Sequence, residues 1–234
     1  MPSTTSTLRF FCVALYRAMA KGRHFMFRTA ASFVRVLGGI SAQPLLTREQ
    51  MIQTETAHGG IIVVGSHTDL TNKQLEKLHE IQGIKFIEVN AELVTETDAF
   101  EKEIERCLSA ESEAIENGVT VCIYTTRRLI TAGTRDKEDD LRLAVRISDA
   151  LQSLVGNLDV VPEFVIAKGG ITSSDVATKA LSIEQARVLG QICPGIPVWQ
   201  AGDSSKFPKV PYIVFPGNVG TDETLKQAVY ILLG

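Results

Sequence analysis

The chain has 234 residues, of which 44% are hydrophobic and 22% are charged, and its formal net charge is −3. This is the composition of an ordinary folded protein, and it excludes the disordered and fibrous classes. The balance of charge gives no sign of a surface for nucleic acid. We therefore expect no nucleic-acid partner. No apolar run reaches the roughly 18 residues that a membrane span needs, so we expect no membrane partner either.

The first 48 residues differ in charge from the rest. They hold seven Lys or Arg and no acid, and Glu49 is the first carboxylate. An acid-free segment that contains Arg and Ser is typical of an organelle transit peptide. Targeting by residues 1–20 therefore stays open, with the cytoplasm as the default location. Residues 46–59 are polar and are expected to link a segment of residues 1–45 to a domain of residues 60–234.

From Ile61 onward, short apolar runs alternate with helical patterns. The expected strands cover residues 61–65, 84–89, 119–126, 163–170, 196–202 and 210–217. The expected helices cover residues 71–83, 95–117, 141–156, 173–181, 182–190 and 221–232. In the first helix, Thr71 and Gln74 have the spacing of a capping box. The charged run 134–141 is expected in a solvated loop. This alternation predicts a three-layer αβα domain with a mostly parallel sheet.

The cysteines and histidines show no metal-ligand spacing. The four cysteines are far apart and none forms a C-x-x-C pair, so we expect four reduced thiols rather than disulfides. No metal site held by protein side chains is predicted.

Three of the expected strands end in the same way. Each apolar run is followed by glycine, then by small polar residues, and then by the start of a helix. The residues are Gly65 and Ser66; Lys168, Gly169, Gly170, Thr172, Ser173 and Ser174; and Gly217, Asn218, Gly220 and Thr221.

These strand ends have the features of a phosphate site. Glycine lets a phosphate approach the backbone, and the first amides of the following helix point at the strand end. The helix dipole favours an anion there, while Thr172 and Ser173 add donors. Lys168 would add a charge if its side chain points into the crevice. The alternative is a tight turn in which Thr172 and Asp175 cap the helix. Three such turns in one domain favour the phosphate site, although none matches the P-loop or the dinucleotide fingerprint.

A further polar group follows the third strand. Thr125, Thr126, Arg127 and Arg128 lie on the same rim of the expected sheet. The two arginines either meet phosphates or are solvated at the surface, and the sequence does not choose between these roles.

The same segments resemble a known family. "VVGSHTDLTNKQLEKL", "FVIAKGGITSSDVATKAL" and "VPYIVFPGNVGTDETLKQAV" are similar to the nucleotide-binding C-terminal domain of the four-carbon acid sugar kinases, over residues 60–234. Residues 21–46 resemble the last strand and exit of that family's N-terminal domain. On this basis we expect residues 23–37 to form a strand or a strand plus turn.

The resemblance implies ATP and Mg²⁺ as cofactors and a four-carbon sugar acid of the 3-oxo-tetronate class as the substrate. It implies that the nucleotide contacts Ser66, Lys168, Gly169, Gly170, Thr172, Ser173, Gly217, Asn218 and Gly220. No catalytic residue is assigned.

The chain also departs from that family. Its members begin with an Asp-rich motif in a large sugar-binding domain, and no such segment precedes residue 60. We therefore expect residues 1–45 to be the remnant of that domain or a leader, and the kinase to be incomplete without it. The alternative is a non-catalytic nucleotide-binding or interaction module. A homo-oligomer is compatible with the sequence.

Overall fold

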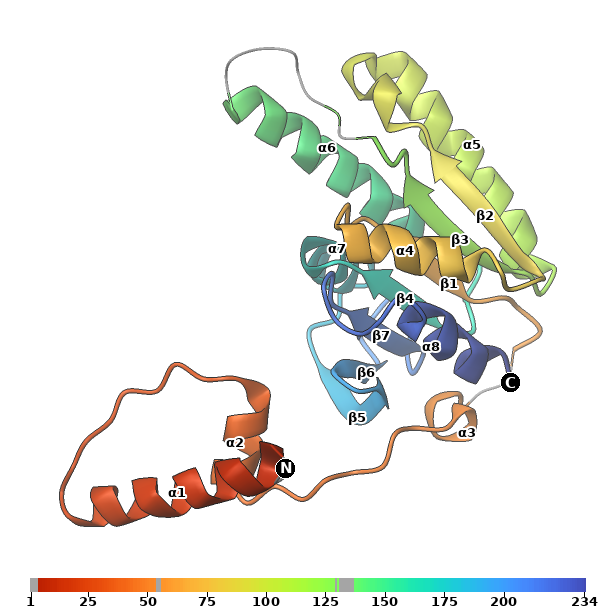
Figure 1. Cartoon of the computed structure of the whole chain (residues 1–234). Helices are drawn as coiled ribbons and strands as arrows, with labels where there is room; N and C mark the ends of the chain where they lie inside the picture. The colour runs from red at the N-terminus through yellow and green to blue at the C-terminus, as the bar shows by residue number, and fades with distance from the viewer. Residues whose placement is uncertain (1–3, 54–55, 129, 131–136) are drawn as a thin grey trace. The chain divides into compact units, whose positions relative to one another are not determined.

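The computed structural model describes residues 4–53, 56–128, 130 and 137–234 (Figure 1). The chain divides into two compact units, Met1–Pro44 and Leu45–Gly234. Each unit has its own hydrophobic core.

The first unit is helical. Helix α1 (Thr4–Ala20) packs against helix α2 (Ala31–Leu37) around a small core of Cys12, Leu15 and Phe33. The strand expected within residues 23–37 is therefore wrong, since its second half is α2. In a helix Phe33, Val36 and Leu37 share one face and reach α1 together, whereas alternation along a strand would separate Val36 from Leu37.

The second unit contains one seven-stranded sheet. Its strands are β1 (Ile61–Val64), β2 (Ile84–Val89), β3 (Thr120–Thr125), β4 (Val165–Lys168), β5 (Ala186–Cys193), β6 (Ile196–Ala201) and β7 (Pro211–Phe215). Their order across the sheet is β2-β3-β1-β4-β7-β6-β5. The first five strands in this order pair in parallel, whereas β6 and β5 pair antiparallel.

Helices cover both faces of this sheet, which confirms the three-layer αβα prediction (Figure 1). Ile61 and Val63 point into a core with α5 (Thr97–Glu116), α6 (Lys137–Gly156) and the π-helical turn η2 (Val176–Ala180). Ile62 and Val64 point the other way, to α3 (Arg48–Met51), α4 (Asp69–Leu78) and α8 (Thr224–Leu233). The short elements η1 (Ala91–Thr95) and α7 (Gly170–Asp175) follow β2 and β4.

Three expectations about the elements need correction. Residues 182–190 were expected to be helical, but β5 begins at Ala186 and pairs with β6. The cap of α4 is Thr68, whose Oγ1 accepts a hydrogen bond from the Thr71 amide, so Thr71 is not the cap. Helix α6 begins at Lys137 and includes the end of the charged run expected as a loop, while residues 134–136 lie outside the described part.

Two simpler expectations concern cysteines and membranes. All four cysteines are buried and none is in a disulfide, as predicted. Among the described residues, no helix combines the length and the apolar character needed to cross a membrane.

Candidate functional site

The three glycine-containing turns meet at one edge of the sheet. Strands β1, β4 and β7 are parallel neighbours, and their last residues Val64, Lys168 and Phe215 are in register. After β1 the chain enters α4 on one face of the sheet, and after β4 it enters α7 and η2 on the other. Where the chain leaves two neighbouring strands toward opposite faces of the sheet, a crevice opens outside the carboxyl ends of those strands. Ligands of open α/β sheets bind in such a crevice.

Ser66 lies at the centre of this meeting point. A Cβ added to Gly169 would lie 3.3 Å from Ser66 Cβ, and one added to Gly217 would lie 3.1 Å from Ser66 Oγ. The turns after β1, β4 and β7 are therefore in van der Waals contact.

The two glycines after β4 differ in their surroundings. Gly169 has φ +133° and ψ 150°, a conformation that side chains disfavour, and a Cβ there would lie 3.0 Å from Thr172 Oγ1. Gly170 begins α7, and no atom lies within 4 Å of a Cβ added to it. The space expected for a ligand is thus open beside Gly170, whereas Gly169 shapes the turn.

The hydroxyl groups after β4 also divide into two kinds. Thr172 contacts Gly65, where an added Cβ would lie 2.2 Å from Thr172 Oγ1, and it lines a pocket. Ser173 is buried, and its Oγ lies within donor distance of the Ala167 and Gly169 carbonyl oxygens, at 2.7 and 2.6 Å. In this arrangement Thr172 can meet a ligand, while the Ser173 hydroxyl is used by the backbone.

Lys168 is turned inward. Its side chain is fully buried, and Nζ donates to the carbonyl oxygens of Pro216 and Gly217 at 2.7 and 3.1 Å. The ammonium also lies 4.4 Å from the centre of the Phe215 ring. Burial lowers the pKa of Lys168 to about 8. The Lys168 ammonium is thus engaged by the turn after β7, and Lys168 is not among the residues that line the pocket beside these turns.

The turn after β7 is held mainly by α4. The hydroxyls of Thr68 and Thr71 lie 3.1 and 3.0 Å from the Gly217 carbonyl oxygen, within donor distance. The Gln74 amide donates to the carbonyl oxygens of Val219 and Thr221, at 3.2 and 2.8 Å. Asn218 is exposed. Gly220 is also exposed, and its φ of +89° turns the chain toward Thr224 at the start of α8.

A pocket of about 290 Å³ opens beside these turns. Gly65, Thr125 and Thr172 form its base at the strand ends. Side chains of α6 and α7 form a largely apolar wall; they are Leu141, Val145, Ile147, Leu151 and Ile171. Several of these apolar groups are unusually exposed, among them Ile171 at 73% and Leu141 at 63%. Such an opening can take a flat apolar group next to a polar one.

His67 and the two arginines complete the rim. Burial and the Arg127 charge lower the pKa of His67, so its ring, which lines the pocket, is mostly neutral near pH 7. Arg127 donates to the Ser66 carbonyl and to Asn72 Oδ1, so it braces the first turn. Arg128 is exposed, lines the pocket and pairs with Glu92 at 3.2 Å. The sequence left both arginine roles open and gave no signal for His67.

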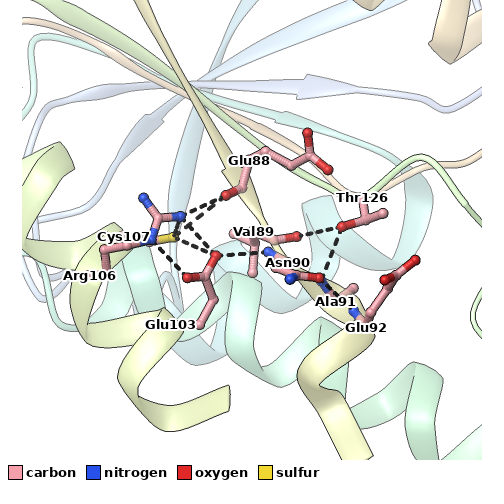
Figure 2. A network of polar contacts seen from close by, with 9 residues as sticks. All are labelled: Glu88, Val89, Asn90, Ala91, Glu92, Glu103, Arg106, Cys107 and Thr126. Carbon is pink, nitrogen blue, oxygen red and sulfur yellow. Dashed lines mark hydrogen bonds and ion pairs between the residues drawn. The ribbon is translucent and has the colours of Figure 1, made fainter. Parts of the chain in front are cut away.

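A polar network surrounds Ala91, which also lines the pocket (Figure 2). Thr126 Oγ1 accepts from the Ala91 amide and donates to the Val89 carbonyl, both at 3.2 Å. Glu103 accepts from the Asn90 amide at 2.9 Å and from Arg106, whose guanidinium lowers the pKa of Glu103. The connection from β2 to η1 is therefore rigidly tied to β3 and α5.

Metal ligands are sparse in this region. Within the described ranges, no group of three or more His, Cys, Asp or Glu side chains is placed to hold an ion. Asp175 lines the pocket, but its carboxylate accepts from Ser148 at 2.9 Å and pairs with Lys179 at 3.4 Å. A metal ion would depend on oxygen atoms supplied by a ligand and by water.

The second unit is thus an α/β domain in which three glycine-containing turns meet at the carboxyl edge of a mostly parallel sheet. The family comparison is more specific. The model of the nucleotide-binding C-terminal domain family matches residues 61–225, and the chain belongs to this family. A comparison with curated proteins gives no match.

Solved structures show the same fold. A domain of unknown function (DUF1537) from Bordetella bronchiseptica, a domain-swapped dimer with bound citrate, is 17% identical with a TM-score of 0.60, over 75% of this chain and 41% of that one. A Haemophilus influenzae DUF1537 protein is 19% identical with a TM-score of 0.55, over 86% and 45%. A Salmonella typhimurium LT2 protein described as a candidate tRNA synthase is 17% identical with a TM-score of 0.59, over 84% and 44%. This chain thus spans less than half the length of these three neighbours.

Proposed function

We propose that the second unit binds ATP at the carboxyl edge of its sheet. The observation that carries this proposal is the convergence of the turns after β1, β4 and β7 around Ser66, beside an apolar pocket. Membership of the nucleotide-binding C-terminal domain family supports a nucleotide as the ligand.

In this proposal the two ends of the nucleotide use different surfaces. The phosphates lie against Ser66, Gly170 and Thr172, where the backbone of Gly170 without a Cβ and the hydroxyls of Ser66 and Thr172 can approach them. The base lies against the apolar wall of α6, which would cover exposed Leu141 and Val145. The pocket volume of about 290 Å³ is at the small end of ligand pockets, which range from about 300 to 1,000 Å³. It therefore suits the nucleoside end, with the phosphates outside it along the turns.

Magnesium is compatible with this arrangement without a dedicated cage. Mg²⁺ keeps several waters and is commonly held by substrate phosphates with one or two carboxylates. Asp175 is the carboxylate that lines the pocket, although Ser148 and Lys179 already engage it. ATP should therefore bring most of the metal ligands with it.

We further propose that the bound ATP is used to phosphorylate a four-carbon acid sugar of the 3-oxo-tetronate class. The basis is the resemblance of the Lys168–Asp175 and Pro216–Gly220 segments to such kinases. Phosphoryl transfer needs positioning and charge stabilisation more than covalent chemistry from the protein. The acceptor sugar and the base that activates it have no assigned residues here, so the ATP-binding half is the part proposed for this chain.

Calorimetry on the full chain tests the nucleotide proposal. ATP should bind, more tightly with Mg²⁺ than without it, and adenosine should bind more weakly than ATP. A folded chain that takes up neither ATP nor ADP at millimolar concentrations would contradict the proposal and favour an interaction protein that keeps only the fold.

A second candidate is a nucleotide-binding module without catalysis. It is favoured by the family match over residues 61–225, whose description names nucleotide binding and no reaction. Incubation of the purified chain with ATP, Mg²⁺ and tetronates separates the two candidates. We expect no appreciable turnover from this chain by itself, and robust phosphorylation would show that the substrate site is present.

A further inference from the structure

Lys168 carries a charge that is buried in the second unit. Its ammonium lies beneath the turn after β7, where it contacts two consecutive carbonyl oxygens, those of Pro216 and Gly217. Within the described residues no carboxylate pairs with it, and burial is the cause of its lowered pKa. A buried cation without a counter-ion is costly, so its retention calls for an electrostatic use.

The contacts of Lys168 fix the direction of two amides. In a trans peptide the N–H points opposite to the C=O of the preceding residue. The Pro216 and Gly217 carbonyls both point at Lys168, so the N–H groups of Gly217 and Asn218 point away from it. Asn218 is exposed, and in the described part of the chain neither amide donates to a protein acceptor. Two successive free amides on one side of a turn form an anion-binding concavity.

We propose that the Gly217 and Asn218 amides bind phosphoryl oxygens of the nucleotide, with Lys168 as the positioning residue that holds both peptides from beneath. The proposal rests on the proposed ATP site and adds a phosphate contact made by the backbone. Lys168 acts without touching the ligand: it orients the donors, and its charge makes the potential above them more positive. Thr68 and Thr71 assist by holding the Gly217 carbonyl from the α4 side.

The first experiment removes one amide. Asn218→Pro deletes the N–H, while Asn218→Ala keeps it and removes the same side chain. Calorimetry of both full-length variants with ATP and with adenosine separates the effect of the lost N–H from the effect of the lost side chain. Because Asn218→Pro loses a hydrogen bond to a charged phosphate, it should bind ATP about tenfold more weakly than Asn218→Ala. Their affinities for adenosine should agree within about twofold. Equal ATP affinities would overturn the phosphate contact.

The second experiment removes the charge of Lys168. Lys168→Met should lower ATP affinity about tenfold and leave adenosine affinity nearly unchanged. Ile166→Ala, a buried change two residues earlier on the same face of β4, is the control for lost stability. A variant that merely loosens the fold, as the control does, should not lose ATP selectively. Equal ATP binding by wild type and Lys168→Met would overturn the role of Lys168 and leave the proposed function intact. Wild-type protein that binds no ATP would overturn both.

A pH profile separates positioning from simple packing. The groups that face the ammonium are the Pro216 and Gly217 carbonyls and the Phe215 ring, and none of them titrates. The preference of the wild type for ATP over adenosine should therefore fall as the pH rises through about 8, where Lys168 loses its proton. In Lys168→Met this step should be absent. The same step in both proteins would contradict the inference.

Discussion

At the scale of single residues, Gly169 and Gly170 have separate tasks. Gly169 occupies a backbone region that is nearly restricted to glycine, so Gly169→Ala should destabilise the second unit by about 1–3 kcal/mol. The added Cβ would also crowd Thr172 Oγ1 and Ser66 Cβ. Urea denaturation measures this loss. If Gly169→Ala is as stable as the wild type, the turn does not need its positive φ.

Gly170 supplies the matching test of function. Its φ is not positive and the space beside it is open, so Gly170→Val should fold with little loss of stability. The new side chain would fill space proposed for phosphate, and ATP affinity should fall. Calorimetry on the folded variant measures this effect. Unchanged ATP affinity would remove the Gly170 turn from the proposed site.

Glu111 is a buried acid that the proposed site does not use. It lies on α5, is fully buried, and neither carboxyl oxygen has a hydrogen-bond partner among the described residues. Burial raises its pKa to about 9. The folded protein therefore keeps a proton on Glu111 at pH 7, whereas the unfolded chain releases it near pH 4.5.

The sign of the pH effect follows from this difference. Between pH 4.5 and about 9 the folded state binds more protons than the unfolded state, so the contribution of Glu111 to stability falls as the pH rises. By pH 7 the loss is about 3 kcal/mol. Glu111→Gln cannot titrate, so its stability relative to the wild type should increase across this range. Glu116→Gln, on the exposed side of α5, is the control. Parallel curves for Glu111→Gln and wild type would contradict the expectation.

At the scale of elements, helix α6 forms the apolar wall of the pocket. Val145 is 50% exposed there, which leaves apolar surface uncovered in the absence of a ligand. Val145→Asp should weaken adenosine and ATP binding to a similar extent, because it would alter the base end of the site. Its exposure predicts little loss of stability.

A matched control for this change lies on β5. Val188 is 65% exposed and does not line the pocket. Val188→Asp introduces the same charge and should leave both affinities unchanged. If Val145→Asp lowers ATP affinity and spares adenosine, the base lies elsewhere and α6 contacts another part of the ligand.

At the scale of the whole molecule, the first unit exposes many apolar side chains. Phe10 is 79% exposed and Met26 is fully exposed, and the unit carries no acid to balance its Lys and Arg residues. Among its described residues, the buried core consists of Cys12, Leu15 and Phe33. Exposed apolar patches of this kind drive association.

The full chain should therefore self-associate or be poorly soluble in a concentration-dependent way. Sedimentation velocity measures this, and removal of residues 1–44 should reduce it. Polar replacements of Phe10, Met26 and Ile40 in the intact chain test the same surface without truncation. If the full chain, the truncated chain and the polar variants are all soluble monomers, the prediction is contradicted. The alternative, a targeting segment, is then strengthened.

The sequence by itself determined the layered architecture of the second unit. Runs such as Ile61–Val64 and Val165–Lys168 are apolar at every position or nearly so, which happens when both faces of a strand are covered. It also located the three turns that meet at the sheet edge, because glycine followed by small polar residues is a local signal. Their use as a nucleotide site stays a prediction.

Only the tertiary structure decided features that depend on distant partners. Segment 186–193 has no clear period, and its pairing with β6 makes it a strand. Residues 31–37 are helical because α1 offers them one apolar face. The direction of Lys168 depends on the carbonyls of Pro216 and Gly217 in the turn after β7, 48 and 49 residues away in sequence. Burial of Glu111 likewise arises from packing of α5 on the sheet. The local sequence pattern shows which residues are apolar or small. The hydrogen-bond partners of a polar side chain, and the direction in which it points, are set only when the elements pack together.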